Sequence, residues 1–428
     1  MTDISQNNGA ASGLSLRLAA PWVISALFLL MMPTIFQSNS AITIMNQMAI
    51  TIIFALAYNM LLGQAGMLSF GHAVYMGVGG FMCMHIMNYV EDFSIPLPLP
   101  VLPLFGGLFG MGLATIIGSF STRKAGTVFA MISLGVGELI AACSIIIVAF
   151  FGGEEGISGD RTYGLPVFGT EFIRQIEVYY LISFWLILSA LLMYLFSRTP
   201  IGRMANAVRD NPERAEFLGY SARRVRYISF CASGFFAGIA GGLFAINYEI
   251  LTEENLNLGL SGTILLITFL GGVGFFFGPI LGAIVFTLLQ TVLSLETELW
   301  QLYVGALFVL TVMYFPGGLA GVLMMHSPAV VTGKLGSLVV PYIKTLVPAI
   351  LGILGLAGFM EIVFHLRHAA VGEEEMTLFW MTFNSHGFAP VTITLVVAAA
   401  GFWLAKRTAP DMAAAWHKSL TPDGGPTS

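Results

Sequence analysis

Long apolar runs recur along the whole of this 428-residue chain, and they constrain its fold more than any other feature. A helix needs about 20 consecutive, predominantly apolar residues to span a bilayer. Such runs predict spans at 20–36, 41–62, 66–90, 99–120, 127–151, 178–196, 228–247, 299–316, 338–364 and 388–405. The apolar stretch 260–294 is long enough for two short helices, broken at the glycine-rich residues 271–274 and at Gly278–Pro279. The sequence therefore predicts an all-α fold, a polytopic transmembrane helix bundle with about ten core spans and two C-terminal spans.

The composition of the chain excludes several other protein classes. Hydrophobic residues make up 57% of the sequence and charged residues 10%, whereas an average soluble domain has about 25% charged residues. So few charges cannot form the exterior of a soluble fold, and a formal net charge of −5 gives no electrostatic basis for binding DNA or RNA. The three cysteines lie inside apolar runs, which excludes a disulfide scaffold and a cysteine-based zinc site. A cytosolic enzyme, a disordered chain and a nucleic-acid-binding protein are therefore excluded.

The distribution of basic residues predicts how the chain is oriented in the membrane. Lys and Arg accumulate in cytoplasmic loops, and seven of the 18 basic residues fall within 198–226. This loop is therefore predicted to be cytoplasmic, and counting spans from it places the N-terminal tail, 1–19, and the C-terminus on the same side. Arg161 and Arg174 are exceptions, because they belong to the loop 152–177, which is predicted to be outside. The first apolar run is interpreted as a transmembrane helix and not as a cleaved signal peptide, because another span follows it at once.

The basic loop 198–226 contains signals for a short helix of its own. Asp210 and Asn211 supply side-chain acceptors just before Pro212, which suits the first turn of a helix, and Gly219 is a typical helix end. One interpretation is a basic anchor that only fixes the topology. Because a topology signal does not need a capped helix, we favour a docking helix for a soluble partner.

The common catalytic and nucleotide-binding motifs are missing from the sequence. It has neither a GxxxxGK[ST] motif nor an HExxH motif. His365 and His368 could share a helix face, but a lone pair at a membrane edge is better explained as polar side chains that reach the membrane surface than as a metal site. Ser158 lies in a GxSG pattern similar to that of intramembrane proteases, yet it falls in a charged, glycine-rich loop without a partner histidine on the next span. We therefore predict no catalytic residue, no metal and no cofactor.

Polar residues inside the predicted spans are few. Asn59 and Gln64 bracket the end of the second span, Ser69 and His72 lie near the start of the third, and Glu138 lies near the middle of the fifth. Such residues usually face the bundle interior or a pathway, because polar groups in lipid are unfavourable. For Glu138 an interhelical hydrogen bond and a role in a pathway or gate both remain open, whereas for His72 a structural role is favoured. The scarcity of ionisable groups argues against an ion-coupled carrier.

Several segments together are similar to a known family. The sequence YNMLLGQAGMLSFGHA, residues 58–73, resembles the signature of the LivM/LivH permeases, the membrane subunits of branched-chain amino acid ABC importers. Further resemblances to the LivM-like half of this family occur in order at 124–130, 137–139, 152–159, 201–219, 270–283 and 316–319. The resemblance extends over about 40–325 of the chain, and it implies a permease domain at 20–325 followed by an extension at 326–428 with two predicted spans and a polar tail.

The resemblance implies the transmembrane permease subunit of an ATP-driven importer in the bacterial inner membrane. The substrate would be branched-chain amino acids or a related small solute such as urea, an amide or another organic acid. The implied partners are a second, LivH-like permease, two ABC ATPases and a periplasmic solute-binding protein, and the ATPases rather than this chain would hydrolyse ATP. The alternative is a stand-alone, ion-coupled secondary transporter. Uptake after ATP depletion with the proton gradient maintained would separate the two.

The resemblance also assigns candidate site residues to this chain. The loop 198–226 would couple to an ATPase through Arg203, Arg209, Asp210, Pro212, Ala215 and Gly219. Candidates for the translocation pathway are Asn59, Gln64, Gly66, Ser69, Gly71, His72, Glu138, Gly271 and Gly274. The segments around Gly66 and Gly274 are weakly alike, which suggests a possible inverted repeat.

Overall fold

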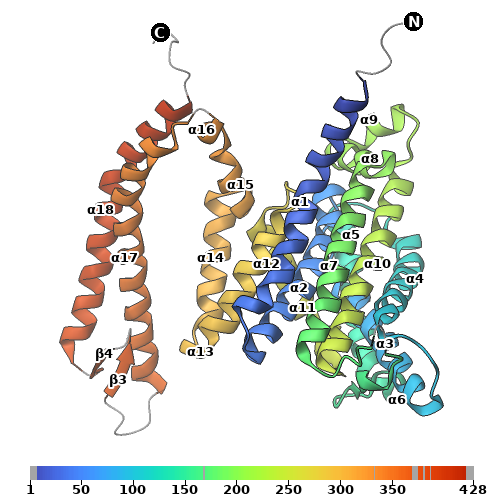
Figure 1. The fold of residues 1–428 in the computed structure, drawn as a ribbon. Helices are drawn as coiled ribbons and strands as arrows, with labels where there is room; N and C mark the ends of the chain where they lie inside the picture. The colour runs from blue at the N-terminus through green and yellow to red at the C-terminus, as the bar shows by residue number, and fades with distance from the viewer. Residues whose placement is uncertain are drawn as a thin grey trace, which may run out of the picture. The chain divides into compact units, whose positions relative to one another are not determined.

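The computed structural model describes residues 7–166, 169–331, 333–368, 375–378, 381–385 and 387–420, and most of them are helical (Figure 1). The α-helices are α1 (Asn7–Ile35), α2 (Asn39–Asn59), α3 (Ala73–Phe93), α4 (Leu102–Ser121), α5 (Thr127–Ile146), α6 (Val148–Phe151), α7 (Gln175–Arg198), α8 (Pro200–Asp210), α9 (Pro212–Phe217), α10 (Ala222–Tyr248), α11 (Leu258–Gly271), α12 (Gly278–Leu288), α13 (Ser294–Glu296), α14 (Trp300–Tyr314), α15 (Gly318–Met325), α16 (Ser327–Val331), α17 (Leu335–His368) and α18 (Phe388–Leu420). The chain therefore folds as the predicted all-α polytopic bundle.

Short elements connect these helices. The π-helical turns are η1 (Met60–Gln64) and η5 (Leu289–Leu293), and the 3-10 turns are η2 (Leu99–Val101), η3 (Arg161–Tyr163) and η4 (Glu253–Asn255). The strands β1 (Ile157–Ser158) and β2 (Ile250–Leu251) pair antiparallel, as do β3 (Glu375–Leu378) and β4 (Met381–Asn384). The first pair joins the loop before α7 to the end of α10.

The chain divides into two compact units. The first contains the described residues of Met1–Leu293 and Val304–Gly321, and the second contains those of Ser294–Tyr303 and Val322–Ser428. The division into a permease domain, 20–325, and an extension, 326–428, stays a prediction, since the second unit also contains residues 294–303 of the predicted permease domain. α1 already begins at Asn7, within the predicted tail 1–19. Residues 1–6 of that tail and the predicted polar end at 421–428 lie outside the described residues.

α10 is the central helix of the first unit, where it packs against α2, α3 and α4. Glycines make this packing close: a Cβ on Gly238 would lie 2.2 Å from the carbonyl oxygen of Gly106 on α4, and a Cβ on Gly241 would lie 1.8 Å from that of Met76 on α3. Without a hydrophobic driving force between helices in lipid, such close backbone contact stabilises their association. Glycines therefore lie at the helix contacts in the core of the bundle.

Eight helical segments in the described part of the chain are long and apolar enough to span a membrane, or nine if the bent pair Trp300–Tyr314 and Gly318–Val331 forms one span. The eight are Asn39–Gln64, Leu99–Ser121, Thr127–Ile146, Gln175–Arg198, Ala222–Tyr248, Gly278–Glu296, Leu335–His368 and Phe388–Lys418. The predicted total of about twelve crossings also needs α3 and two shorter apolar helices, Ala19–Ile35 and Leu258–Gly271. That total stays a prediction for these three helices.

Three local features differ from the sequence-based expectations or refine them. The predicted span 66–90 begins only at Ala73, because Gly66 adopts a left-handed φ of 67° and ends the helical turn η1 before α3 starts. The break predicted in 260–294 is confirmed, since α11 ends at Gly271 and α12 begins at Gly278. The loop 198–226 contains two helices instead of one, because Thr199 caps α8 in addition to the predicted cap of α9 by Asn211.

The second unit is built around the hairpin of α17 and α18, which lie side by side with β3 and β4 at one end (Figure 1). Their backbones are close, since a Cβ on Gly401 would lie 2.4 Å from the backbone nitrogen of Gly352. Glu361 on α17 accepts hydrogen bonds from the hydroxyls of Thr297 and Tyr303, the latter at 2.7 Å. Both helices predicted for the extension are therefore present, and Glu361 is paired within its own unit.

Candidate functional site

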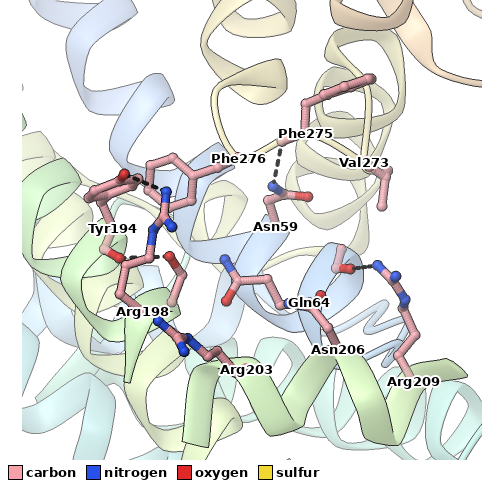
Figure 2. Close-up of a pocket in the computed structure, with 13 residues that line it drawn as sticks. Asn59, Gln64, Tyr194, Arg198, Arg203, Asn206, Arg209, Val273, Phe275 and Phe276 are labelled. Atoms are coloured by element: carbon pink, nitrogen blue, oxygen red, sulfur yellow. Dashed lines mark hydrogen bonds between the residues drawn. The ribbon is translucent and has the colours of Figure 1, made fainter. Parts of the chain in front are cut away.

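A polar cavity of about 330 Å³ lies where three segments of the first unit meet (Figure 2). The segments are the end of α2 with η1, the corner between α7 and α8, and the loop between α11 and α12. The lining residues are Asn59, Gly63, Gln64, Tyr194, Ser197, Arg198, Arg203, Asn206, Arg209, Val273, Gly274, Phe275 and Phe276. Five of these were predicted as site residues: Asn59, Gln64 and Gly274 for the pathway, and Arg203 and Arg209 for coupling.

Two buried amides form the wall contributed by α2 and η1. The side-chain nitrogen of Asn59 donates to the carbonyl oxygen of Phe275 at 3.2 Å, which ties α2 to the loop before α12. The side-chain oxygens of Asn59 and Gln64 are buried, and neither has a hydrogen-bond partner among the described residues. Because an unpaired buried acceptor lowers stability, each of these two oxygens keeps the capacity to accept a hydrogen bond.

Three guanidinium groups give the cavity a positive charge. Arg198 lies over the ring of Tyr194, with 4.9 Å between its guanidinium carbon and the ring centroid, and donates to the tyrosine oxygen at 2.6 Å. Arg203 is exposed, and its guanidinium makes neither a hydrogen bond nor an ion pair within the described part of the chain. Arg209 pairs with Asp210, its Nε lying 2.9 Å from a carboxylate oxygen. None of the lining residues is acidic, so the cavity favours anions.

Arg209 also fastens α8 to the end of α2. Its guanidinium donates to the backbone carbonyl of Gly63, as the dashed line in Figure 2 shows. Its side chain lies on Gly66, where an added Cβ would be only 2.6 Å from Cγ of Arg209. Two separate constraints thus require glycine at position 66: its positive φ and the close approach of the Arg209 side chain. The predicted coupling loop and the predicted signature segment are therefore in direct contact.

The glycines before α12 pack the third segment tightly. A Cβ on Gly271 would lie 2.2 Å from the carbonyl oxygen of Gly278, and one on Gly63 would lie 2.5 Å from that of Val273. Gly274 has open space around its Cβ position and lines the cavity. Gly271 therefore brings α11 and α12 together, whereas Gly274 leaves room in the cavity.

Three pathway candidates lie away from this cavity, in the packed core. His72 is fully buried, and its Nε2 lies 3.1 Å from the hydroxyl of Ser233, which itself donates to the carbonyl oxygen of Ala57 at 2.6 Å. The backbone oxygen of Ser69 accepts from Tyr58 at 2.8 Å. Gly71 is equally enclosed, since its Cβ would lie 2.2 Å from the carbonyl oxygen of Ser133. These contacts agree with the structural interpretation favoured for His72.

Glu138 lies on a different surface of the first unit. It is exposed on α5, and its carboxylate makes no hydrogen bond or ion pair with any described residue. Only 28% of the most apolar stretch of α5 is buried, the lowest share among the candidate spans of this unit. The carboxylate therefore points away from the helices of its own chain.

The second half of the coupling loop presents an apolar tip. Pro212 lies in the first turn of α9, Ala215 is buried beneath it, and Gly219 adopts a φ of 84° after its end. At the end of α9 the apolar side chains of Phe217 and Leu218 are exposed, with exposed fractions of 91% and 67%. Large apolar groups exposed this far beside a basic loop are typical of an interaction site.

Sequence reasoning did not identify several contributors to these surfaces. Tyr194 and Arg198 line the cavity but lie outside the segments that resemble the family. Asn206 lines the cavity, and Phe217 and Leu218 form the exposed tip; all three lie within the segment 201–219, but none was singled out as a site residue. Helical spacing does contain a signal for the cavity, since Arg198 falls one turn after Tyr194 at the end of an apolar run.

Comparisons with known proteins agree on one family. Residues 40–312 match the family model described as the branched-chain amino acid transport system / permease component. The chain is 27% identical over 305 residues to the high-affinity branched-chain amino acid transport system permease protein LivM of Escherichia coli, covering 66% of this chain and 70% of that protein. LivM of Salmonella typhimurium gives the same identity and coverage. The Autoinducer 2 import system permease protein LsrC of Klebsiella pneumoniae is 34% identical over 154 residues, covering 34% of this chain and 45% of that protein. No solved structure matches the chain.

Proposed function

Because this chain belongs to the family of branched-chain amino acid transport permease components, we propose that it imports branched-chain amino acids or a related small solute. It is a multi-pass permease subunit of the ABC type. In this proposal it resides in the bacterial inner membrane with both termini in the cytoplasm. Its partners are a second, LivH-like permease, two ABC ATPases and a periplasmic binding protein. ATP is hydrolysed by the ATPases, and this chain provides the path.

The contact of Arg209 with the end of α2 is the observation that carries this proposal. α8 and α9 lie at the surface, yet Arg209 donates to the carbonyl of Gly63 and packs on Gly66. From the same segment Asn59 reaches the carbonyl of Phe275 in the loop before α12. A displacement of α8 by a docked ATPase would therefore act on two segments of the membrane bundle at once.

The tip of the coupling loop supplies the docking contact in this proposal. Pro212 and Gly219 bound α9, buried Ala215 fixes it to the bundle, and Asp210 holds Arg209 in place. Phe217 is left exposed at the end of the helix. An aromatic side chain of this kind suits a pocket on a soluble partner, because buried aromatic anchors dominate the energy of protein interfaces.

Glu138 supports a pathway along the outer face of α5. A carboxylate facing lipid is strongly unfavourable, so its exposed position requires either water or a second protein subunit beside it. Both conditions are met where two permeases enclose a path. We therefore assign Glu138 to the pathway, next to the point near the middle of α5 where the backbones of Gly71 and Gly137 approach closely.

The energy source is tested by uptake of radiolabelled leucine, valine and urea in cells that express the full set of partners. Depleting ATP while respiration maintains the proton gradient is expected to stop uptake of the substrate. Dissipating the gradient at constant ATP is expected to leave uptake unchanged. Uptake that follows the gradient instead would establish the alternative, an ion-coupled secondary transporter.

The docking contact is tested by the substitution Phe217→Asp. The charged side chain would be buried at the interface, so we expect at least about a tenfold loss of the co-purifying ATPase. The matched control is Tyr163→Asp, which changes a side chain that is 55% exposed in the predicted outer loop. Equal recovery of the ATPase with both variants would contradict the assignment.

A further inference from the structure

We propose that the polar cavity binds a phosphate ester that carries free hydroxyl groups, such as a phosphoglycerol group. The cavity is lined by Arg198, Arg203 and Arg209 and by no acidic residue. Asp210 neutralises one of the three guanidinium groups through its contact with Arg209, so two positive charges remain. The inference concerns binding by this chain alone, and it holds whether or not an ATPase docks beside the cavity.

The remaining charge is available to a ligand. Arg203 has no partner among the described residues, and Arg198 uses its ring contact and one hydrogen bond with Tyr194. Guanidinium groups bind phosphate oxygens through paired, charge-assisted hydrogen bonds. The two arginines lie on consecutive helices, α7 and α8, and both border the same space (Figure 2). This arrangement provides a phosphate site without displacing an existing ion pair.

The amides explain why the ligand carries hydroxyl groups. Gln64 is 7% exposed and Asn59 is 2% exposed, and the side-chain oxygen of each lacks a hydrogen-bond donor. Figure 2 shows the Gln64 side chain extending into the space between Asn59 and the two arginines. The phosphodiester group itself offers only acceptors, so it cannot satisfy an unpaired oxygen. Hydroxyl groups on the esterified headgroup would donate to the side-chain oxygen of Gln64.

Aromatic side chains at the rim favour a lipid as the source of this group. The ring of Trp22 on α1 lies 5.7 Å from that of Tyr194 and 6.2 Å from that of Phe277. Trp and Tyr are enriched at the level of lipid headgroups, and basic pockets between helices on the cytoplasmic side bind anionic headgroups. We therefore expect phosphatidylglycerol, which joins a phosphate to a hydroxylated headgroup, and a soluble glycerol phosphate is the other source of the same chemistry.

Native mass spectrometry of the purified full-length chain tests the inference. The chain is equilibrated with equal amounts of phosphatidylglycerol and phosphatidylcholine, and the bound lipid is counted. Arg203→Gln is expected to reduce bound phosphatidylglycerol about tenfold, the effect of losing one charge-assisted hydrogen bond. The matched control Arg224→Gln changes an exposed arginine of the same loop that does not line the cavity, and it should retain the lipid.

Two further experiments test the role of the headgroup hydroxyls and the source of the phosphate ester. Gln64→Leu is expected to reduce the preference for phosphatidylglycerol over phosphatidic acid, which has no headgroup hydroxyls. Binding of radiolabelled glycerol 3-phosphate is measured with the chain in phosphatidylcholine nanodiscs. Loss of that binding in Arg203→Gln, without any preference for phosphatidylglycerol, supports the site with a soluble source. If Arg203→Gln and Arg224→Gln behave alike with both ligands, the proposal is overturned.

Discussion

At the scale of single residues, Arg161 explains why a basic side chain lies in a loop predicted to be outside. It is 8% exposed, and its guanidinium donates to backbone carbonyls at the ends of the loop and of α10 and to the side chain of Gln175. Glu249 lies 3.7 Å away and also accepts from the backbone nitrogen of Arg161. Next to it, hydrogen bonds from Thr162 lower the pKa of Asp160. Arg161 is therefore a structural clamp, and the positive-inside rule does not apply to it.

Replacing this clamp should weaken the fold of the first unit. Arg161→Ala leaves Glu249 and several carbonyls without their donor, so we expect a loss of about 3 kcal/mol of stability. Thermal unfolding followed by fluorescence-detected size-exclusion chromatography measures the effect. Arg174→Ala is the control, because Arg174 is 77% exposed and its pair with Glu177 contributes at most about 1 kcal/mol. Similar melting temperatures for the two variants would contradict a clamp.

Gly66 is the residue at which coupling can be tested with the smallest change. Gly66→Ala imposes a left-handed φ of 67° on a residue with a Cβ, at roughly 1–2 kcal/mol, and it also displaces Arg209. We expect normal insertion of the chain and recovery of the ATPase but a loss of most solute uptake. The control Gly333→Ala has a φ of 68° and open space at its Cβ position, and it should keep uptake. Equal uptake in both variants would count against coupling through Arg209.

The sequence could predict part of the candidate site and not the rest. Asn59, Gln64 and Arg209 belong to recognisable segments, and the structure brings them to one cavity. Tyr194 and Arg198 could not be assigned, because only the fold places the end of α7 beside the loop before α12. For His72 the sequence favoured a structural role but could not identify its partners, because the contacts with Ser233 and the neighbouring rings are set by tertiary packing.

At the scale of elements, apolar periodicity predicted the long helices well and their interruptions less well. The break between α11 and α12 was predictable from Gly278 and Pro279, because both residues mark a helix start. The irregular segment before α3 was not predicted, because Gly66 lies within a run apolar enough to continue a span. α8 was not predicted either. Its N-cap, Thr199, can be recognised as a helix start only when the end of α7 at Arg198 is known.

The interface of α4 and α10 shows why glycine spacing determines which helices pair. Gly106 and Gly110 on α4 face Gly234 and Gly238 on α10, and added Cβ atoms would approach backbone carbonyls within 2.6 Å or less at Gly106, Gly110 and Gly238. Both helices therefore carry small residues four positions apart, the pattern that lets membrane helices approach closely. No other residue fits at these positions without moving one helix.

Gly238→Leu is accordingly expected to prevent assembly of the first unit. Its side chain would overlap the backbone of α4, since even a Cβ lies 2.2 Å from the carbonyl oxygen of Gly106. We expect aggregated protein in size-exclusion chromatography. Gly112→Leu is the matched control on α4, because no atom lies within 4 Å of its Cβ position, and this variant should elute as the wild type does. Monodisperse Gly238→Leu protein would show that this contact is dispensable.

At the scale of the whole molecule, the surfaces that the chain leaves open are as informative as its core. α5 exposes Glu138 together with the apolar side chains Met131, Leu139 and Ile146, whose exposed fractions are 72%, 62% and 76%. A charge and a large apolar surface on one helix cannot both be satisfied by lipid. A second permease against the apolar part and a solute path at the carboxylate would satisfy both, in line with the proposed assembly.

Substitutions of Glu138 therefore test whether this residue is needed for transport or for the stability of the fold. Glu138→Leu removes a carboxylate that has no partner among the described residues, so the melting temperature of the isolated chain should stay unchanged or rise. Uptake by the assembled transporter should fall at least about tenfold, because the path loses a group that binds or orients the solute. Glu138→Gln, which keeps the shape and the hydrogen-bonding capacity, tells whether the charge itself is needed. The control Leu139→Ala changes an adjacent exposed side chain and should keep uptake. A destabilised chain with normal uptake would instead assign Glu138 to packing.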